Sequence, residues 1–390
     1  MLKVLFYLTL SALSLGQFVA IGRTGESKFY IFDIFVLVFA VYGLIYFLSV
    51  KKSFKLPKTS YLFLLFTLSA TISLVLALPN FEGVEIAVGT LYLIRWISYL
   101  LSSLVVFNMV DKKILTWEMF ENVVIYSGLF LAVVGFIQIL VLPDFTKLDP
   151  SLGWDPHKNR LASTFFDPNF VGAYFVICLT ILLDKLFSKK DFKPAFFLVI
   201  LVALFLTFSR SGWGMFGVVI LVYGIFKSRS LLLVSLFVAF LAYFAVPRIQ
   251  TRISGLTDPS DSASFRLVSW KNTWEIVEDY PLFGVGFNTF RYVQKDYGFL
   301  DVDTFLTHSG AGSDSSLLFV LATTGIFGLV FYLSGLVFPA ISAFSKKKGE
   351  WLVVISLVLG FLLESQFINS LFYPQIMFVF LTTLFLVGNV

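Results

Sequence analysis

Four arginines lie at the borders of long apolar runs, and their chemistry indicates anion binding. Arg210 stands in "TFSRSGWGMFG", residues 207–217, with an apolar run on each side, and Arg160, Arg266 and Arg291 lie in segments that separate other apolar runs. A guanidinium grips phosphate oxygens at two points and stays charged at any physiological pH. Several arginines at a lipid–water boundary would form a receptor for a phosphorylated lipid head group. Each one alone could equally be a capping or interfacial residue.

Two further side chains are candidates for proton transfer. Asp314 and His308 precede the apolar run that begins near residue 314. A carboxylate close to a hydroxyl group can act as a general base. Asp314 could instead cap the following helix by accepting from the amides of Ser316 or Leu317, and both roles could hold together. For His308 the ordinary expectation is a loop histidine without a special role.

The composition shows what must position these residues. Of the 390 residues, 58% are hydrophobic and only 14% are charged, whereas a soluble domain carries roughly 25% charged residues. The apolar stretches are about 20 residues long, which predicts an all-α, polytopic membrane protein. One cysteine and two histidines exclude a disulfide within the chain and predict no metal site. The net charge of +5 follows from the placement of the lysines and predicts no nucleic-acid partner.

The apolar runs predict about 12 transmembrane helices. We expect them at residues 3–22, 29–50, 59–79, 86–110, 121–142, 168–187, 194–208, 212–226, 231–246, 314–341, 351–371 and 374–390. The short connections on one side hold 15 Lys and Arg residues, against 6 on the other side. By the positive-inside rule both termini are cytoplasmic, and the four arginines, Asp314 and His308 lie outside.

Two extracytoplasmic segments are longer than turns. The first covers residues 143–167, and the larger covers residues 247–313. Within the larger segment, "SASFRLVSWKNTWEIVEDY" mixes Phe265, Val268 and Trp274 with charged residues. This pattern predicts an amphipathic helix along the membrane surface that ends before Pro281.

Four motifs occur in a fixed order along the middle of the chain. They are "NRLASTFFDPNFVGAYF" (159–175), "FSRSGWGMF" (208–216), "RLVSWKNTWEIVEDYPLFGVGFNTF" (266–290) and "SDSSLLFVLATTGIFGL" (313–329). In this order they resemble the O-antigen ligase/polymerase family of membrane enzymes that join or polymerise surface polysaccharide. The resemblance divides the chain into N-terminal helices (1–150), a family core (151–330) and C-terminal helices (331–390).

The resemblance implies glycosyl transfer on the outer face of the cytoplasmic (inner) membrane. The donor would be an oligosaccharide on a polyprenyl diphosphate, held by Arg210 and Arg266 with help from Arg160. The acceptor would be a second lipid-linked glycan for a polymerase, or a lipid A core for a ligase. No cofactor is implied, because the sequence has no phosphate-binding loop and no dinucleotide fingerprint. A lipid-linked oligosaccharide flippase is the alternative class, although it should spread polar groups across the bilayer.

One position departs from the family's pattern. Ligases of the family place a histidine at the head of the last motif, where this chain has Asp314. Some polymerases carry an aspartate there, so the resemblance favours a polymerase with Asp314 as the base. His308 would take that role if the alignment slips locally.

Other charged residues lie within or beside apolar runs. Arg95 and Glu364 could pair with each other or line the acceptor cavity, because charges inside spans usually face the bundle interior. We expect Asp33 to be solvated near an outer end. Asp167 should cap the sixth span.

Overall fold

The computed structural model describes residues 1–24, 27–148, 156–255, 262–300, 312–347 and 349–388. These residues form an all-α bundle with one small two-stranded sheet. The helices are α1 (Leu2–Leu15), α2 (Ile31–Ile45), α3 (Ser60–Ala77), α4 (Gly83–Asp111), α5 (Trp117–Val141), α6 (Pro168–Phe187), α7 (Pro194–Leu206), α8 (Arg210–Phe226), α9 (Arg229–Ala245), α10 (Pro247–Ser254), α11 (Ser262–Asp279), α12 (Phe290–Asp296), α14 (Ser316–Lys346), α15 (Trp351–Glu364) and α16 (Pro374–Val387). Strands β1 (Ala20–Thr24) and β2 (Ser27–Tyr30) pair in antiparallel fashion between α1 and α2.

Helices occupy all twelve predicted positions, but they differ in length. In the described chain six helices are long and apolar enough to cross a membrane, namely α3, α4, α5, α6, α14 and the continuous helix Ile31–Val50. Helices α9 and α10, which meet at a bend of 98°, make a seventh if they count as one span. Helices α1, α7, α8, α15 and α16 are shorter. The chain is therefore a multi-helix membrane protein, and the count of twelve crossings stays a prediction.

The first helix is shorter than the apolar run predicts. Helix α1 ends at Leu15, and residues 20–24 form a strand instead of continuing the predicted span to residue 22. Gly16 adopts a φ of 56°, and a Cβ there would collide with the backbone of Thr164. The amide of Gln17 donates to the Thr164 carbonyl oxygen at 2.9 Å. This close approach between distant segments ends the helix.

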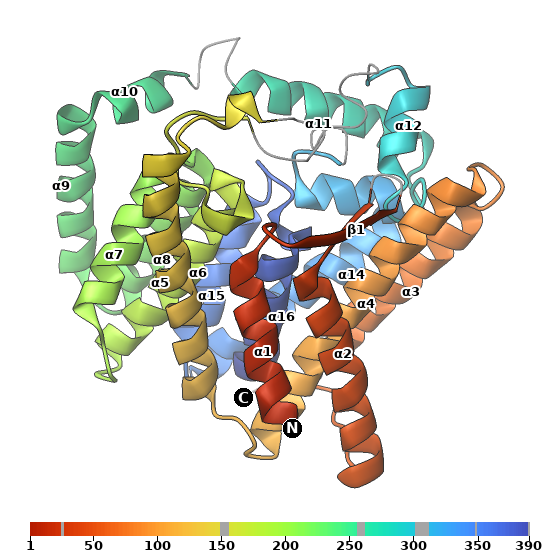
Figure 1. Cartoon of the computed structure of the whole chain (residues 1–390), viewed down its shortest axis with the longest axis horizontal. Helices are drawn as coiled ribbons and strands as arrows, with labels where there is room; N and C mark the ends of the chain where they lie inside the picture. The colour runs from red at the N-terminus through yellow and green to blue at the C-terminus, as the bar shows by residue number, and fades with distance from the viewer. Residues whose placement is uncertain (25–26, 149–155, 256–261, 301–311, 348, 389–390) are drawn as a thin grey trace.

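The core of the bundle is built around two helices that are apolar on all sides. Almost every residue of α6 and α16 is buried, which is typical of a helix surrounded by other helices. Helix α3 packs on α14, α8 on α15, and α2 and α16 pack on α4. By contrast, α9 has no buried residue and stands at the edge of the bundle (Figure 1).

The two ends of the bundle differ. Both termini lie at one end, whereas α10, α11 and α12 cross the other end (Figure 1). We call this second end the α11 end. Helix α11 stops at Asp279, before Pro281, as the sequence predicts. Its first half turns Arg266, Ser269 and Trp270 toward the protein, while Phe265 and Val268 are more than half exposed.

Candidate anion-binding site

Arg210 begins helix α8 at a sharp turn. Phe208 adopts a φ of 48° between α7 and α8, and the Ser209 hydroxyl caps α8 by accepting from the amide of Gly212. This turn places Arg210 in the first turn of the helix at the α11 end. Its Nη1 donates to the carbonyl oxygen of Arg252 on α10 at 3.1 Å. The half-buried guanidinium is thus held where the end of the bundle meets α10.

Arg160 lies against the same turn. Its Nε donates to the Thr207 carbonyl oxygen at 2.8 Å, and its Nη2 donates to Asn169 Oδ1 at 3.1 Å. The same Asn169 oxygen accepts from the Ser209 hydroxyl at 3.0 Å. The structure therefore joins the first and second sequence motifs around Arg160 and Arg210.

Helix α10 adds two arginines that the sequence analysis missed. Arg248 donates to the carbonyl oxygens of Lys158 and Asn159, directly before Arg160. Its guanidinium also lies 4.1 Å from the centre of the Phe208 ring. Arg248 and Arg252 are four residues apart, a spacing that places both on one face of a helix. That spacing in "PRIQTR" was the signal that could have found them.

Two carboxyl groups, those of Asp167 and Glu364, are buried at the α11 end. Asp167 caps α6 by accepting from the amide of Asn169 at 2.7 Å, as predicted. Burial raises the pKa of the Asp167 carboxyl, while the backbone amide of Asn169 and the charge of Arg160 oppose the rise. Glu364, at the end of α15, is also completely buried. Asp167, Glu364 and Arg266 thus lie at the same end of the bundle as Arg160 and Arg210.

Asp314 lies beside α11 but does not cap α14. The cap is Ser315, whose hydroxyl accepts from the amide of Leu318 at 3.3 Å, so the capping alternative for Asp314 is wrong. The amide of Asp314 donates to the Ser269 hydroxyl at 3.1 Å. Ser269 is three residues after Arg266, one helical turn along the same face of α11. The structure thus brings Asp314 and Arg266 to the same side of that helix.

The third and fourth motifs pack on each other through their glycines. The amide of Val285 donates to the Ala322 carbonyl oxygen, and the amide of Ile326 donates to that of Pro281, both at 2.9 Å. Gly284 and Gly325 have φ values of 69° and 66° at this contact, and a Cβ on either would collide with the facing backbone. These glycines let the segment that follows α11 pack against α14, the helix that begins two residues after Asp314.

The remaining candidates are placed apart from this group. Arg291 lies on α12, on the opposite side of the α11 end from α10 (Figure 1). His308 lies outside the described residues. Among the residues that the structure describes, no three His, Cys, Asp or Glu side chains gather as metal ligands.

Arg95 does not pair with Glu364. It donates to Asp33 at 2.8 Å, and both side chains are only 10% exposed. Asp33 also accepts from the Tyr99 hydroxyl at 2.9 Å, so the expectation of a solvated Asp33 was wrong. The ion pair joins α2 to α4. Asp33 and Arg95 belong to separate apolar runs, so neither run alone predicts that they pair.

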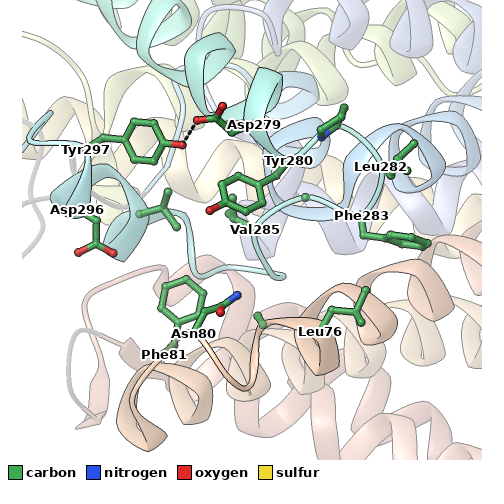
Figure 2. Close-up of a pocket in the computed structure, with 14 residues that line it drawn as sticks. Leu76, Asn80, Phe81, Asp279, Tyr280, Leu282, Phe283, Val285, Asp296 and Tyr297 are labelled. Carbon is green, nitrogen blue, oxygen red and sulfur yellow. Dashed lines mark hydrogen bonds between the residues drawn. The ribbon is translucent and has the colours of Figure 1, made fainter.

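A separate cavity of about 460 Å³ opens between the end of α3 and α12 (Figure 2). Tyr280 and Tyr297 face Asn80 and Phe81 across it. None of the arginines predicted from the sequence lines this cavity.

The fold defines a multi-helix membrane protein, and one end of its bundle is rich in arginine. Residues 195–333 match the family model described as O-antigen ligase, which confirms the resemblance to the O-antigen ligase/polymerase family. The match supports an enzyme of the ligase or polymerase type in surface polysaccharide assembly. Members of this family lie in the bacterial inner membrane and act on lipid-linked glycans and glycolipids. No curated protein matches the chain.

Proposed function

We propose that the protein is a surface polysaccharide (O-antigen) polymerase. It transfers an oligosaccharide from a polyprenyl diphosphate donor to a second lipid-linked glycan on the outer side of the cytoplasmic membrane. The observation that carries this proposal is that Arg160, Arg210, Arg266 and Asp314 all lie at the α11 end. Arg160 and Arg210 share one hydrogen-bonded turn, and Asp314 is bonded to the helix that carries Arg266. These residues come from four different motifs, and an anionic substrate accounts for several arginines at one end of the bundle.

The transfer step follows from the charges of these residues. The hydroxyl oxygen of the acceptor attacks the anomeric carbon, Asp314 takes the hydroxyl proton, and the bond from that carbon to the diphosphate breaks. The configuration inverts because the displacement is direct. Negative charge develops on the departing diphosphate, and Arg210 and Arg266 stabilise it, as fixed donors do at other sites of charge development. Arg160 positions the turn that carries Arg210.

The membrane orientation is part of the proposal. The connections rich in lysine lie at the end that holds the termini, so this end is cytoplasmic by the positive-inside rule. The α11 end then faces outward, where a polyprenyl diphosphate head group would meet the arginines. The donor's lipid tail would remain between the helices.

A ligase is the second candidate, because the matched family model is described as O-antigen ligase. It would use the same donor site and transfer the glycan to a lipid A core or another acceptor. A flippase is less well supported, because the arginines of the site gather at one end and do not line a path across the bilayer.

The test uses purified protein in vesicles with polyprenyl diphosphate-linked repeat units from the host and no added nucleotide. A polymerase yields a ladder of longer glycans on the polyprenyl carrier. A ligase yields glycan on added lipid A core and no ladder. The absence of product with either acceptor contradicts glycosyl transfer by this chain.

A further inference from the structure

The chain between α15 and α16 carries buried polar atoms that lack partners. This acceptor segment, as we call it, covers residues 364–370. Among the described residues, Glu364 Oε1, Ser365 Oγ and Asn369 Oδ1 are buried without a hydrogen-bond partner. Buried polar groups are nearly always hydrogen-bonded, so three such atoms in one short segment point to a water molecule or a ligand as the partner.

Of these three groups, Glu364 has the largest free-energy cost of burial, because its side chain is a carboxyl group. Its side chain is completely buried, and the one hydrogen bond that it accepts comes from the Ser370 hydroxyl on Oε2. Helix α15 has 14 residues, about 21 Å at the usual rise, which is less than the roughly 30 Å of a bilayer core. Non-helical backbone at this depth occurs where protein or a water-filled cavity surrounds it.

The acceptor segment is hydrogen-bonded to the chain next to Asp314. The amide of Ser316 donates to the Ser365 carbonyl oxygen at 2.8 Å, and the Ser315 hydroxyl donates to Gln366 Oε1 at 3.4 Å. Asp314 therefore directly precedes Ser315 and Ser316, which are both hydrogen-bonded to this segment. Arg266 lies on α11 one turn before Ser269, whose hydroxyl accepts from the Asp314 amide.

Trp270 of α11 contacts the same segment. Its ring centre lies 5.8 Å from that of Phe367, and its Nε1 is buried without a partner. The region therefore offers two oxygens that accept, one hydroxyl that accepts or donates, and one ring N–H that donates. This mixture suits a ligand with several hydroxyl groups.

We propose that the acceptor segment is the subsite for the acceptor sugar, with Glu364 Oε1 accepting a hydrogen bond from a sugar hydroxyl. A carboxyl oxygen accepts hydrogen bonds and offers phosphate no positive charge, so Glu364 favours a sugar hydroxyl over the diphosphate that the arginines bind. The contacts to residues 315 and 316 place that sugar beside Asp314. This inference rests on the proposed function and concerns residues outside the matched range 195–333.

The first test is kinetic and uses Glu364→Gln in the vesicle assay. The amide keeps the size of the side chain but replaces one of its two oxygens by an NH2 donor, so the KM for the acceptor should rise about tenfold. The kcat at saturating acceptor and the KM for the donor should each stay within about twofold. Glu350→Gln is the matched control, because Glu350 lies at the opposite end of α15 and pairs with Lys190.

Other kinetic results overturn the subsite. A large loss of kcat with an unchanged acceptor KM would make Glu364 a proton acceptor or a structural residue. Unchanged constants would mean that the acceptor does not touch Glu364. The melting temperature of the detergent-purified variant shows whether it is folded.

A second measurement uses the wild-type protein and needs no turnover. A lipid-soluble carbodiimide should label Glu364, detected by mass spectrometry, and oligosaccharide released from the host's own polysaccharide should protect it. Glu121, buried in an ion pair at the other end of the bundle, should show no such protection. Labelling that the oligosaccharide leaves unchanged, or that never occurs, overturns the subsite. Because this readout is independent of catalysis, it stands even if the vesicle assay yields no product.

Discussion

Arg160 and Asn169 are joined by a hydrogen bond of 3.1 Å, and the same amide oxygen accepts from Ser209. One side chain at the start of α6 thus fixes both the segment before it and the turn that begins α8. The position of Arg210 depends on this junction, because Arg210 is the next residue after Ser209. The proposed donor site is therefore built on the ends of helices.

Asn169→Ala should weaken donor binding without touching the donor. The substitution removes the shared acceptor and leaves the Arg160 and Ser209 donors without it, so we expect the donor KM to rise about tenfold. Arg160→Ala should have a similar effect, and the double variant should be little worse than either single one. Fully additive effects in this double-mutant cycle would show that the two residues act independently.

Arg210→Lys and Arg266→Lys should each lower kcat at least about a hundredfold. An ammonium keeps the charge but lacks the two-point grip of a guanidinium on a diphosphate. The vesicle assay measures the rate, and size-exclusion chromatography checks that each variant is folded. Arg229→Lys, at the exposed start of α9, is the matched control and should keep full activity. Normal turnover by both site variants would contradict the diphosphate role.

Asp314→Asn should reduce kcat about a hundredfold or more while the donor KM stays near its wild-type value. The amide preserves the size of the side chain but cannot take the proton of the acceptor hydroxyl. Because Ser315 caps α14, the substitution should leave the melting temperature unchanged. If activity persists, the proton acceptor lies elsewhere, and His308→Ala is the next variant to measure.

The stability of the α11 end should depend on the charge of Asp167. Burial raises the pKa of this carboxyl in the folded protein, above the value of about 3.9 expected in the unfolded chain. The folded state therefore binds the proton more tightly, and its contribution to stability is present below about pH 4 and lost as the pH rises through the raised pKa. Asp167→Asn keeps a capping side chain and removes this dependence. Melting temperatures of both proteins between pH 4 and 7 measure the difference, and identical slopes would contradict the expected shift.

The sequence predicts most of the helices because a bilayer leaves few alternatives to an apolar helix. It also predicts that the arginines lie at one end of the bundle, since the connections rich in lysine mark the other end. Their role in binding an anion stays a prediction. The pairing of Asp33 with Arg95 and the contacts of Arg160 with Asn169 and Thr207 depend on which helices pack together, and apolar runs of similar composition do not specify that. The early end of α1 depends on its contact with Thr164, which no local sequence pattern predicts. Arg248 and Arg252 show the opposite case, because their four-residue spacing is visible in the sequence alone.

The ion pair between Lys185 and Glu121 supplies the last prediction, at the end of the bundle that holds the termini. Lys185 Nζ lies 3.0 Å from Glu121 Oε2, and both side chains are at most 2% exposed. Lys185→Met leaves a buried carboxylate without its counter-charge, so it should lower the free energy of unfolding by about 3–5 kcal/mol. Adding Glu121→Leu should restore most of that loss, because two apolar side chains can replace a buried ion pair. Lys193→Met, which breaks the exposed pair with Asp191, should cost less than about 1 kcal/mol. Thermal unfolding in detergent measures all three, and a Lys185→Met protein as stable as the wild type would show that the pair is solvated.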